Sequence, residues 1–286
     1  MDGVLIINKP KGYTSHDIVN IVKKELNTPK VGHAGTLDPN ATGVLPILIG
    51  NATKISKYLI EHDKIYIAEL QLGEKSSTGD LEGEIVEKKE IPKLDIEEIN
   101  NVLKSFLGKQ QQIPPIYSAI KINGKKAYEY ARKGNKLKIE PREIEIMNIS
   151  LIKFQNNVIT FEVKCSKGTY IRVLCEDIAE KLGTVGLMKN LCRIRVNDFD
   201  LENSYTLDDV KNKNVQVINI EEIFKKQPYI KLNDKETKHF LNGVKLSINK
   251  ADGLYRIYNN TFLGLGIIEN NLLKRKRKQN ARKIYE

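Results

Sequence analysis

The sequence GHAGTLDPNATGVLPI, residues 32–47, gathers three glycines and two prolines around a single acidic residue, Asp38. Pro39 disfavours helical backbone at the residue before it, and glycine permits backbone shapes that other residues resist. The segment therefore predicts a stiff, close-turning loop rather than one regular element. Such a loop presents one carboxylate in a fixed place, as a nucleophile or general base requires. On the loop alone, a common Asp-Pro turn with a capping role is the favoured alternative.

Hydrophobic periodicity on both sides of this loop predicts short helices and strands that alternate loosely. Apolar alternation predicts strands at 3–8, 64–73, 143–153 and 158–165. Helical apolar spacing predicts helices after the capping box Thr14–Asp17, from Asn51 to about His62, from Asp95 to Gly108 and from Ile171 to Gly183. The sequence has neither regular βαβ units nor a GxGxxG fingerprint. We therefore predict a mixed α+β fold instead of a doubly wound parallel sheet.

The spacing of the elements changes near the C-terminal end. The chain has 286 residues, which is longer than one usual compact domain. Beyond Ile218–Tyr229 the expected elements are short, with a helix at about 234–242 and strands at 254–258 and 262–268. We predict a large domain over residues 1–228 and a small β-rich domain over residues 229–286.

The formal net charge is +11 and the isoelectric point is about 9.3. An excess of this size indicates a polyanionic partner, most often nucleic acid, although a lysine-rich composition gives the same total. The charge is unevenly distributed. Residues 117–142 carry eight bases and two acids, and residues 274–283 carry seven bases and no acid. Residues 80–98 carry eight acids and three lysines and are expected to face water. Concentrated basic patches favour a nucleic-acid partner.

The composition also argues against several protein classes. No run of about 18 apolar residues is present, so no membrane-spanning segment is expected. The three cysteines, Cys165, Cys175 and Cys192, lack CxxC spacing and suggest reduced thiols in a cytoplasmic protein. The four histidines are scattered, so we predict no metal site.

A carboxylate in a groove that binds phosphates needs a cation beside it, because phosphates raise its pKa. Arg172, just after a glycine turn at a helix start, is the best candidate, although without an identified partner an exposed helix-start arginine is the favoured alternative. Tyr66 and Tyr170 suit either a core or a stacking surface for an unstacked base. His33 suits either a loop histidine bonded to backbone or a ring that fills the space left by a flipped base.

Residues 109–142 interrupt the alternation with a polar, basic segment that contains tyrosines and a double proline. It is typical of an excursion that leaves the core and returns to it. Lysines in such a segment can contact phosphates, and aromatic rings can contact bases. The candidate RNA-binding residues are Lys121, Lys125, Lys126, Arg132 and Lys133. The basic C-terminal tail suits a solvated end as well as a phosphate contact.

Taken together, these motifs resemble the TruB-type tRNA pseudouridine synthases. The run of glycine, histidine, Asp-Pro and ATGVLP follows the family's order and is highly specific. The last 58 residues resemble the family's small PUA-type RNA-binding domain, mostly by position and length. One departure is RVNDFDLENSYTL after the LxRxR element, which affects a local turn. The matching segments are GVLIINKPKGYTSHDIV (3–19), VGHAGTLDPNATGVLPILIGNATK (31–54), KIYIAELQLGEKSSTGDLEGE (64–84), QQQIPPIYSAIKINGKKAYEYARKG (110–134) and KGTYIRVLCEDIAEKLGT with LMKNLCRIRV (167–196).

The resemblance implies a pseudouridine synthase-like fold, with a mixed, mostly antiparallel central sheet flanked by helices and loops. It also implies an enzyme that isomerises the uridine at position 55 in the T-loop of tRNA. The base would be flipped out, cleaved from ribose at N1 and rejoined through C5. No cofactor and no metal are implied. The implied partner is tRNA, and we expect a cytoplasmic monomer.

The resemblance also implies roles for single residues. Asp38 would be the catalytic aspartate, Arg172 its ion-pair partner, and Tyr66 would pack on the target base and offer one possible base for the C5 proton. Tyr170 and Leu191 would line the pocket. His33 would lie against the T-loop where the uridine has left the stack, and residues 109–142 would form the RNA-gripping insertion.

Three chemical roles for Asp38 stay open at this point: attack on C6 of uracil, attack on C1′ of ribose, or removal of a ribose proton. The alternative function is a tRNA-binding protein that assists folding and has lost its chemistry. A further possibility is a relative that acts on a different RNA or a different uridine.

Overall fold

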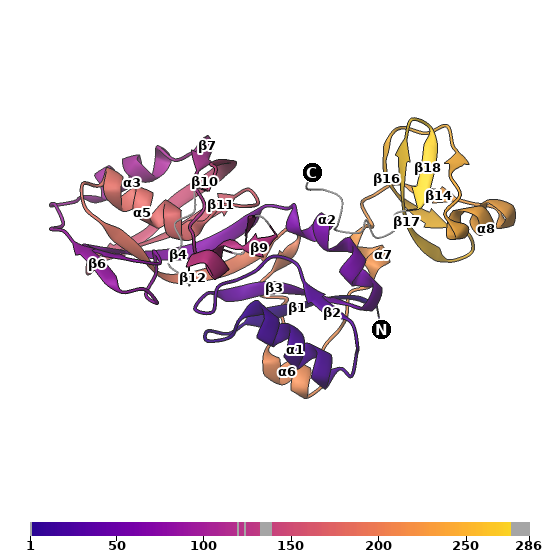
Figure 1. The fold of residues 1–286 in the computed structure, drawn as a ribbon, viewed down its shortest axis with the longest axis horizontal. Helices are drawn as coiled ribbons and strands as arrows, with labels where there is room; N and C mark the ends of the chain where they lie inside the picture. Colours follow the sequence, from indigo (N-terminus) through magenta and orange to yellow (C-terminus); the bar gives the residue numbers. More distant parts are fainter. Residues whose placement is uncertain (1, 119, 123, 132–138, 276–286) are drawn as a thin grey trace.

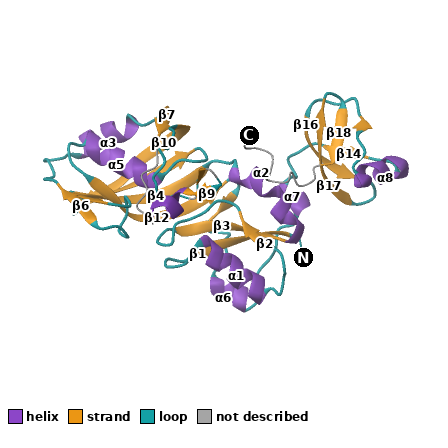
Figure 2. Cartoon of the chain, viewed as in Figure 1, coloured by secondary structure: helices purple, strands orange, loops and turns teal. Residues whose placement is uncertain are grey.

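The computed structural model describes residues 2–118, 120–122, 124–131 and 139–275. Figure 1 shows a large part built on one broad sheet and a smaller part, coloured yellow, that is set apart from it. Helices flank the large sheet on its outer surfaces (Figure 2). Within the described ranges, no helix has the length and apolar character needed to cross a membrane.

The large part contains a nine-stranded sheet in the order β1-β3-β12-β4-β11-β10-β7, with β2 paired to β3 and β13 paired to β12. All these pairs are antiparallel except β12 with β3, which run parallel. The predicted mixed, mostly antiparallel sheet is therefore confirmed. Its strands are β1 (Gly3–Lys9), β2 (Val31–His33), β3 (Thr42–Ile49), β4 (Lys64–Leu72), β7 (Gly108–Gln112), β10 (Arg142–Gln155), β11 (Val158–Cys165), β12 (Gly186–Val196) and β13 (Phe199–Asp200).

Strand β4 runs through the middle of this sheet, and its pattern of burial explains the alternation of apolar residues in its sequence. Buried and half-buried residues alternate along it, with Tyr66, Ala68, Leu70 and Leu72 buried on one face. Period-two alternation of this kind places one face against the core. Tyr66 lies directly opposite Arg193 of β12. The central strand therefore carries a candidate site residue beside the loop that contains Asp38.

Helices cover the sheet at two places. α1 (Ser15–Glu25) packs beside β2 and α6 (Leu207–Lys211), whereas α3 (Ile96–Lys104) and α5 (Ile171–Lys181) pack together over the far end of the sheet (Figure 1). The predicted capping box of α1 is present, because the Thr14 hydroxyl accepts from the Asp17 backbone and the Asp17 carboxylate accepts from the Thr14 backbone. Buried Ile18 and Val22 form its inner face.

The prediction that a helix begins at Asn51 is wrong. Residues Gly50–Ile55 form a 3₁₀ turn, which is followed by the short helix α2 (Ser56–Ile60). Asn51 does not cap this helix, because its side-chain oxygen accepts from the Lys54 ammonium. Its backbone N–H and its side-chain amide both donate to the Asp2 carboxylate at the start of the chain.

The smaller part is a five-stranded sheet in the order β14-β16-β17-β18-β15. Its helix α8 (Asp234–Asn242) begins with a capping box at Asn233 and ends at Gly243, whose φ of 83° is left-handed. Phe240, Ile257, Ile268 and Leu273 form its own core. The short helix α7 (Ile220–Ile223) precedes it, and its strands are β14 (Tyr229–Lys231), β15 (Leu246–Ser247), β16 (Gly253–Tyr258), β17 (Phe262–Glu269) and β18 (Leu272–Arg275).

Two smaller hairpins project from the large sheet. The first is formed by β5 (Glu74–Ser76) and β6 (Ile85–Lys88), and follows β4. The second is formed by β8 (Lys121–Ile122) and β9 (Lys125–Lys126), and leads into α4 (Ala127–Ala131). This second hairpin lies between β7 and β10, whose first pair joins Gln112 to Arg142. The chain thus leaves the sheet after Gln112 and rejoins it at Arg142, at neighbouring strand ends.

Candidate active site

A cavity of about 430 Å³ opens beside the loop between β2 and β3. The loop, the central strands β4 and β12, and the start of α5 all contribute to its walls. Five of the predicted site residues line it together: Asp38, Tyr66, Tyr170, Arg172 and Leu191. Segments that are up to 158 residues apart in the sequence thus meet around one cavity.

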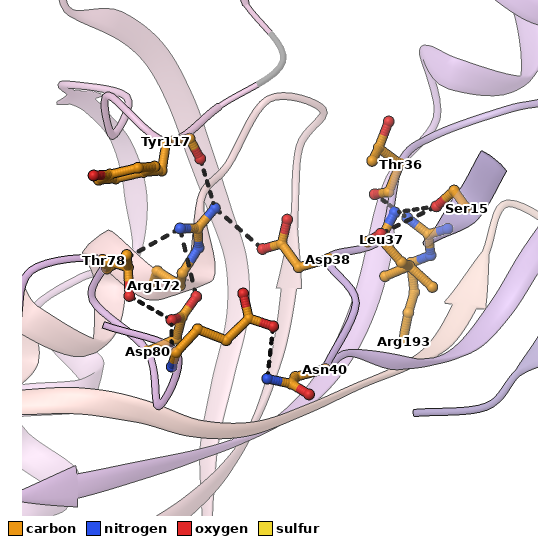
Figure 3. Close-up of polar contacts among 11 residues, drawn as sticks. Ser15, Thr36, Leu37, Asp38, Asn40, Thr78, Asp80, Tyr117, Arg172 and Arg193 are labelled. Carbon is orange, nitrogen blue, oxygen red and sulfur yellow. Dashed lines mark hydrogen bonds and ion pairs between the residues drawn. The ribbon is translucent and has the colours of Figure 1, made fainter. Parts of the chain in front are cut away.

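Ser15, the first residue of α1, fixes the glycine-rich loop by two hydrogen bonds. The Ser15 hydroxyl donates to the Leu37 carbonyl (3.1 Å) and accepts from the Leu37 N–H (2.9 Å), as Figure 3 shows. Gly35 and Gly43 have φ values of +91° and +102°, which side chains other than glycine rarely adopt. A backbone turn from Ala41 N–H to the Asp38 carbonyl closes the segment. The loop is therefore fixed on both sides of its carboxylate.

A buried lysine holds the other side of the loop. The Lys9 ammonium, at the end of β1, donates to the carbonyls of Pro10, Tyr13 and Pro39. Burial lowers the pKa of Lys9 to about 8, while the charge of Asp38 opposes that change. The residue after Asp38 is thus tied to the first strand by a fully buried cation.

Arg172 is shared by two carboxylates. Its Nη2 lies 3.1 Å from Asp38 Oδ2, and its Nη1 lies 3.5 Å from Asp80 Oδ2. It also donates to the carbonyls of Thr78 and Tyr117, both at 3.0 Å (Figure 3). The side chain is 7% exposed, so the alternative of an exposed helix-start arginine is wrong. The structure brings Asp38 and Arg172 together as the sequence suggested.

Asp80 is a site residue that the sequence did not indicate. It belongs to the acidic stretch that was expected to face water, yet it is only 8% exposed. Its Oδ1 accepts from the Thr78 hydroxyl and from the Glu82 N–H. The turn before it contains Gly79 with a φ of +75°, which folds the hairpin back toward α5. The signal available in the sequence was the glycine immediately before an acid.

A hydrogen bond joins the same hairpin to the loop that carries Asp38. The Asn40 side chain donates to Glu82 Oε1 at 2.8 Å (Figure 3). Asn40 lies two residues after Asp38, and Glu82 lies two residues after Asp80. Asp38 and Asp80 are therefore linked in two ways: both pair with Arg172, and the residues two positions after them are hydrogen-bonded to each other.

The electrostatic setting of Asp38 combines opposing effects. Withdrawal from water raises its pKa, the Arg172 charge lowers it, and the Asp80 charge raises it again. The side chain is still 41% exposed, since the cavity is open on one side. The carboxylate is thus reachable by a ligand, and its ionised form is favoured first by the Arg172 guanidinium and then by the Lys9 charge.

The two tyrosines are held differently. Burial raises the pKa of Tyr66, so its hydroxyl is neutral near pH 7, and the Arg193 guanidinium opposes this shift. Tyr170 is fixed through its backbone, because its N–H donates to Gln112 Oε1 (2.8 Å) and its carbonyl accepts from Gln112 Nε2 (3.1 Å). Burial also raises the pKa of Tyr170. Gln112 is another residue that sequence patterns did not single out.

His33 is not among the described residues that line the cavity. His33 lies on β2 with Ile47 as its strand partner and is half-buried. Lys121, Lys125 and Lys126 lie in the β8–β9 hairpin. Arg132 and Lys133 lie outside the described residues. Their predicted contacts with RNA stay predictions.

The chemistry that this arrangement can perform follows from its parts. One accessible carboxylate faces a cavity lined by three tyrosines and by apolar side chains, as a base flipped out of its stack requires. Within the described ranges, no three histidine, cysteine, aspartate or glutamate side chains gather as metal ligands. Nucleophilic or proton-transfer chemistry by a single aspartate is what the geometry supports best.

Comparisons with known proteins agree across the chain. Family models match in three consecutive pieces: TruB family pseudouridylate synthase (N terminal domain) at residues 23–171, tRNA pseudouridylate synthase B C-terminal domain at 172–226, and Pseudouridine synthase II TruB, C-terminal, at 228–277. A tRNA pseudouridine synthase B of Caldanaerobacter subterraneus subsp. tengcongensis is 44% identical over 282 residues, covering 97% of this chain and 99% of that protein. One of Clostridium kluyveri is 42% identical, with 93% and 96% covered.

Solved structures show a similar fold. A chain of a Cbf5-Nop10-Gar1 complex superimposes with a TM-score of 0.69 and 26% identity, covering 93% of this chain and 78% of that one. A chain of an H/ACA RNP bound to a substrate RNA containing 2'-deoxyuridine gives a TM-score of 0.67 at 24% identity, with 93% and 77% covered.

Proposed function

The chain belongs to the TruB family of pseudouridylate synthases, and we propose that it acts on the uridine at position 55 in the T-loop of tRNA. It is a tRNA-modifying isomerase that converts uridine to pseudouridine. The observation that carries the proposal for this site is the ion pair between the accessible Asp38 carboxylate and Arg172 at the wall of the cavity.

The reaction needs no net change in composition. The C1′–N1 bond breaks, uracil turns, C5 bonds to C1′, and the proton on C5 leaves while N1 gains one. Flipping the base out of its stack costs about a few kcal/mol, and less from a loop than from a helix. Contacts between the RNA backbone and basic residues can offset that cost. The protein must then hold the detached base until it is rejoined.

Asp38 is the proposed catalytic group. Ionised, it can attack C6 of uracil, attack C1′ of ribose or remove a ribose proton, and its 41% exposure leaves room for each contact. Arg172 supports the ionised form by direct pairing. Tyr66, whose ring lines the cavity, is the proposed stacking surface, and its neutral hydroxyl can accept the C5 proton only as it releases its own. Tyr170 and Leu191 are proposed to enclose the base.

The RNA is proposed to lie across the cavity mouth and the neighbouring basic insertion. Residues 109–142 and the small C-terminal domain, residues 229–286, are its proposed contacts outside the cavity. His33, on β2 beside the catalytic loop, is proposed to face the T-loop where the uridine has left the stack. The protein is proposed to work as a cytoplasmic monomer, which size-exclusion chromatography with light scattering can check.

Tritium release tests the proposed function directly. The protein is incubated with T-arm RNA that carries tritium at C5 of uridine, because isomerisation at C5 liberates that label to water. We expect release from uridine 55, and its loss when only that uridine is replaced by cytidine. RNA binding without any release would overturn the proposal. The other function considered, folding assistance without chemistry, is not favoured, because the relatives are named as synthases.

A further inference from the structure

The core beside the cavity contains an arginine that none of the roles above uses. Arg193 on β12 is 1% exposed, although its side chain contributes to the cavity wall. Among the residues that the structure describes, no carboxylate forms an ion pair with it. A buried charge is expensive unless it is paired or hydrogen-bonded. Its hydrogen bonds therefore indicate why the charge is there.

All three of its recorded donor contacts go to the loop and strand around Asp38. Arg193 Nε donates to the Val44 carbonyl at 2.8 Å, Nη2 to the Gly35 carbonyl at 3.0 Å, and Nη1 to the Thr36 carbonyl at 3.5 Å. Gly35 and Thr36 precede Asp38, and Val44 follows it. The guanidinium thus bridges both ends of the segment that carries the carboxylate, and Figure 3 places it beside Thr36 and Leu37.

The backbone of Arg193 is also close to this segment. It pairs in parallel with Gly43. A Cβ atom on Gly43 would lie 2.2 Å from the Arg193 carbonyl oxygen, so no side chain fits there. This close approach of the two backbones places the Arg193 side chain against the loop, within hydrogen-bonding distance of its carbonyl groups.

On its other side Arg193 meets Tyr66. The two residues are direct partners in the antiparallel pairing of β12 with β4. Both side chains line the cavity, and the Arg193 charge lowers the pKa of the Tyr66 hydroxyl against the larger raising effect of burial. One side chain therefore bonds to the loop that carries Asp38 and lies beside the tyrosine.

Asp38, the one carboxylate among the described residues that line the cavity, pairs with Arg172, so the Arg193 charge has no carboxylate partner there. Lys9 and Lys64 are further buried cations close enough for the Arg193 charge to act on them. Lys64 donates only to the carbonyls of Ile60 and His62 in its recorded bonds. A surplus of positive charge suits a reaction in which the electron pair of the C1′–N1 bond passes to uracil.

Resting on the proposed function, we propose that Arg193 is a positioning residue for this reaction. It fixes the loop that presents Asp38 and orients the Tyr66 hydroxyl toward the bound base. It acts through these two residues and through its charge, without a bond to the substrate.

Two substitutions and one control test the proposal. Arg193→Met removes the charge and the donors at similar length, Arg193→Lys keeps the charge, and Arg195→Met changes an exposed arginine on the same strand. For each we measure thermal unfolding, affinity for T-arm RNA and the single-turnover rate of tritium release. We expect Arg193→Met to slow turnover about 100-fold, with RNA affinity within about threefold of wild type. Arg193→Lys should turn over about tenfold faster than Arg193→Met, and the rate of Arg195→Met should equal that of wild type.

A double-mutant cycle tests the link to Tyr66. In a Tyr66→Phe background, the fold-reduction in the rate of tritium release caused by Arg193→Met should be at least about fivefold smaller, because the Tyr66 hydroxyl is already absent. Equal effects in both backgrounds overturn the link, and a wild-type rate in Arg193→Met overturns the proposal. If Arg193→Met does not fold, Arg193→Lys replaces it in the same cycle. A wild-type rate of tritium release by Arg193→Lys then overturns the proposal. A wild-type protein that releases no tritium instead overturns the proposed function.

Discussion

The Arg172 guanidinium lies 3.1 Å from the Asp38 carboxylate, and the arginine is buried whereas the aspartate is reachable from the cavity. The pair is therefore asymmetric. The buried arginine is held by protein carbonyls and by Asp80, so that its position does not depend on Asp38. Asp38 can release its contact for chemistry while the guanidinium stays in place.

Asp38→Asn should abolish turnover and leave RNA affinity within about twofold. The amide keeps the size of the side chain but is neither a nucleophile nor a base. The side chain is partly exposed, so that the fold should tolerate the change. Single-turnover tritium release and filter binding of T-arm RNA measure the two effects. A parallel fall in rate and affinity would mean that Asp38 is structural.

Asp80→Asn should slow turnover about 10- to 100-fold and lower the free energy of unfolding by about 1–3 kcal/mol. The change removes one of the two carboxylates that fix Arg172. Glu87→Gln, an exposed acid on the same hairpin, is the matched control. Turnover and urea unfolding are compared for the two variants, and equal behaviour would show that Asp80 does not position Arg172.

Lys9 gives a prediction with a defined sign in pH. Burial lowers its pKa from 10.5 to about 8, so between these values the unfolded chain binds a proton that the folded chain does not. Stability contributed by this group therefore rises with pH over that window and is constant below it. The free energy of unfolding of wild type minus that of Lys9→Met should increase from pH 8 to 10.5. A flat difference in urea titrations would contradict the assigned pKa.

Gln112→Met should destabilise the protein by about 1–3 kcal/mol. It removes both hydrogen bonds to the Tyr170 backbone, one residue before α5 begins, with little change in volume. Gln111→Met, on the exposed face of the same strand, is the control and should be neutral. Urea unfolding measures both. Turnover should also fall for Gln112→Met alone, since α5 carries Arg172.

Affinity for T-arm RNA should fall steeply with salt. Lysines and arginines that contact phosphates release counterions, so log K declines linearly with log salt. The expected loss is at least about tenfold between 50 and 200 mM salt. Filter binding over this range measures the slope, and an unchanged affinity would contradict phosphate contacts by the basic segments.

Local signals in the sequence located much of this architecture. The Thr14–Asp17 capping box, the alternation along β4 and the left-handed Gly243 are short-range features, and each is where the pattern placed it. The pairing of Asp38 with Arg172 was also anticipated, because a carboxylate among phosphates needs a cation.

The residues that were missed depend on long-range contacts. Asp80 stands in an acidic stretch whose average character is exposed, and only the Gly79 turn brings it to Arg172. Arg193 looks like Arg195 in the sequence, yet one is buried under the loop and the other is exposed. Asn51 met Asp2 instead of capping a helix. Periodicity and capping rules do not contain these partners.

The parallel seam between β12 and β3 consists of two residue pairs, and it lies beside the loop that carries Asp38. Every other neighbour in the main path of the sheet is joined along a longer ladder. The ladder of paired residues is thus shortest beside the loop that carries Asp38. Amide deuterium uptake should be faster at this short join than along the longer ladders, so that flexing between the two halves of the sheet concentrates beside the proposed reaction site.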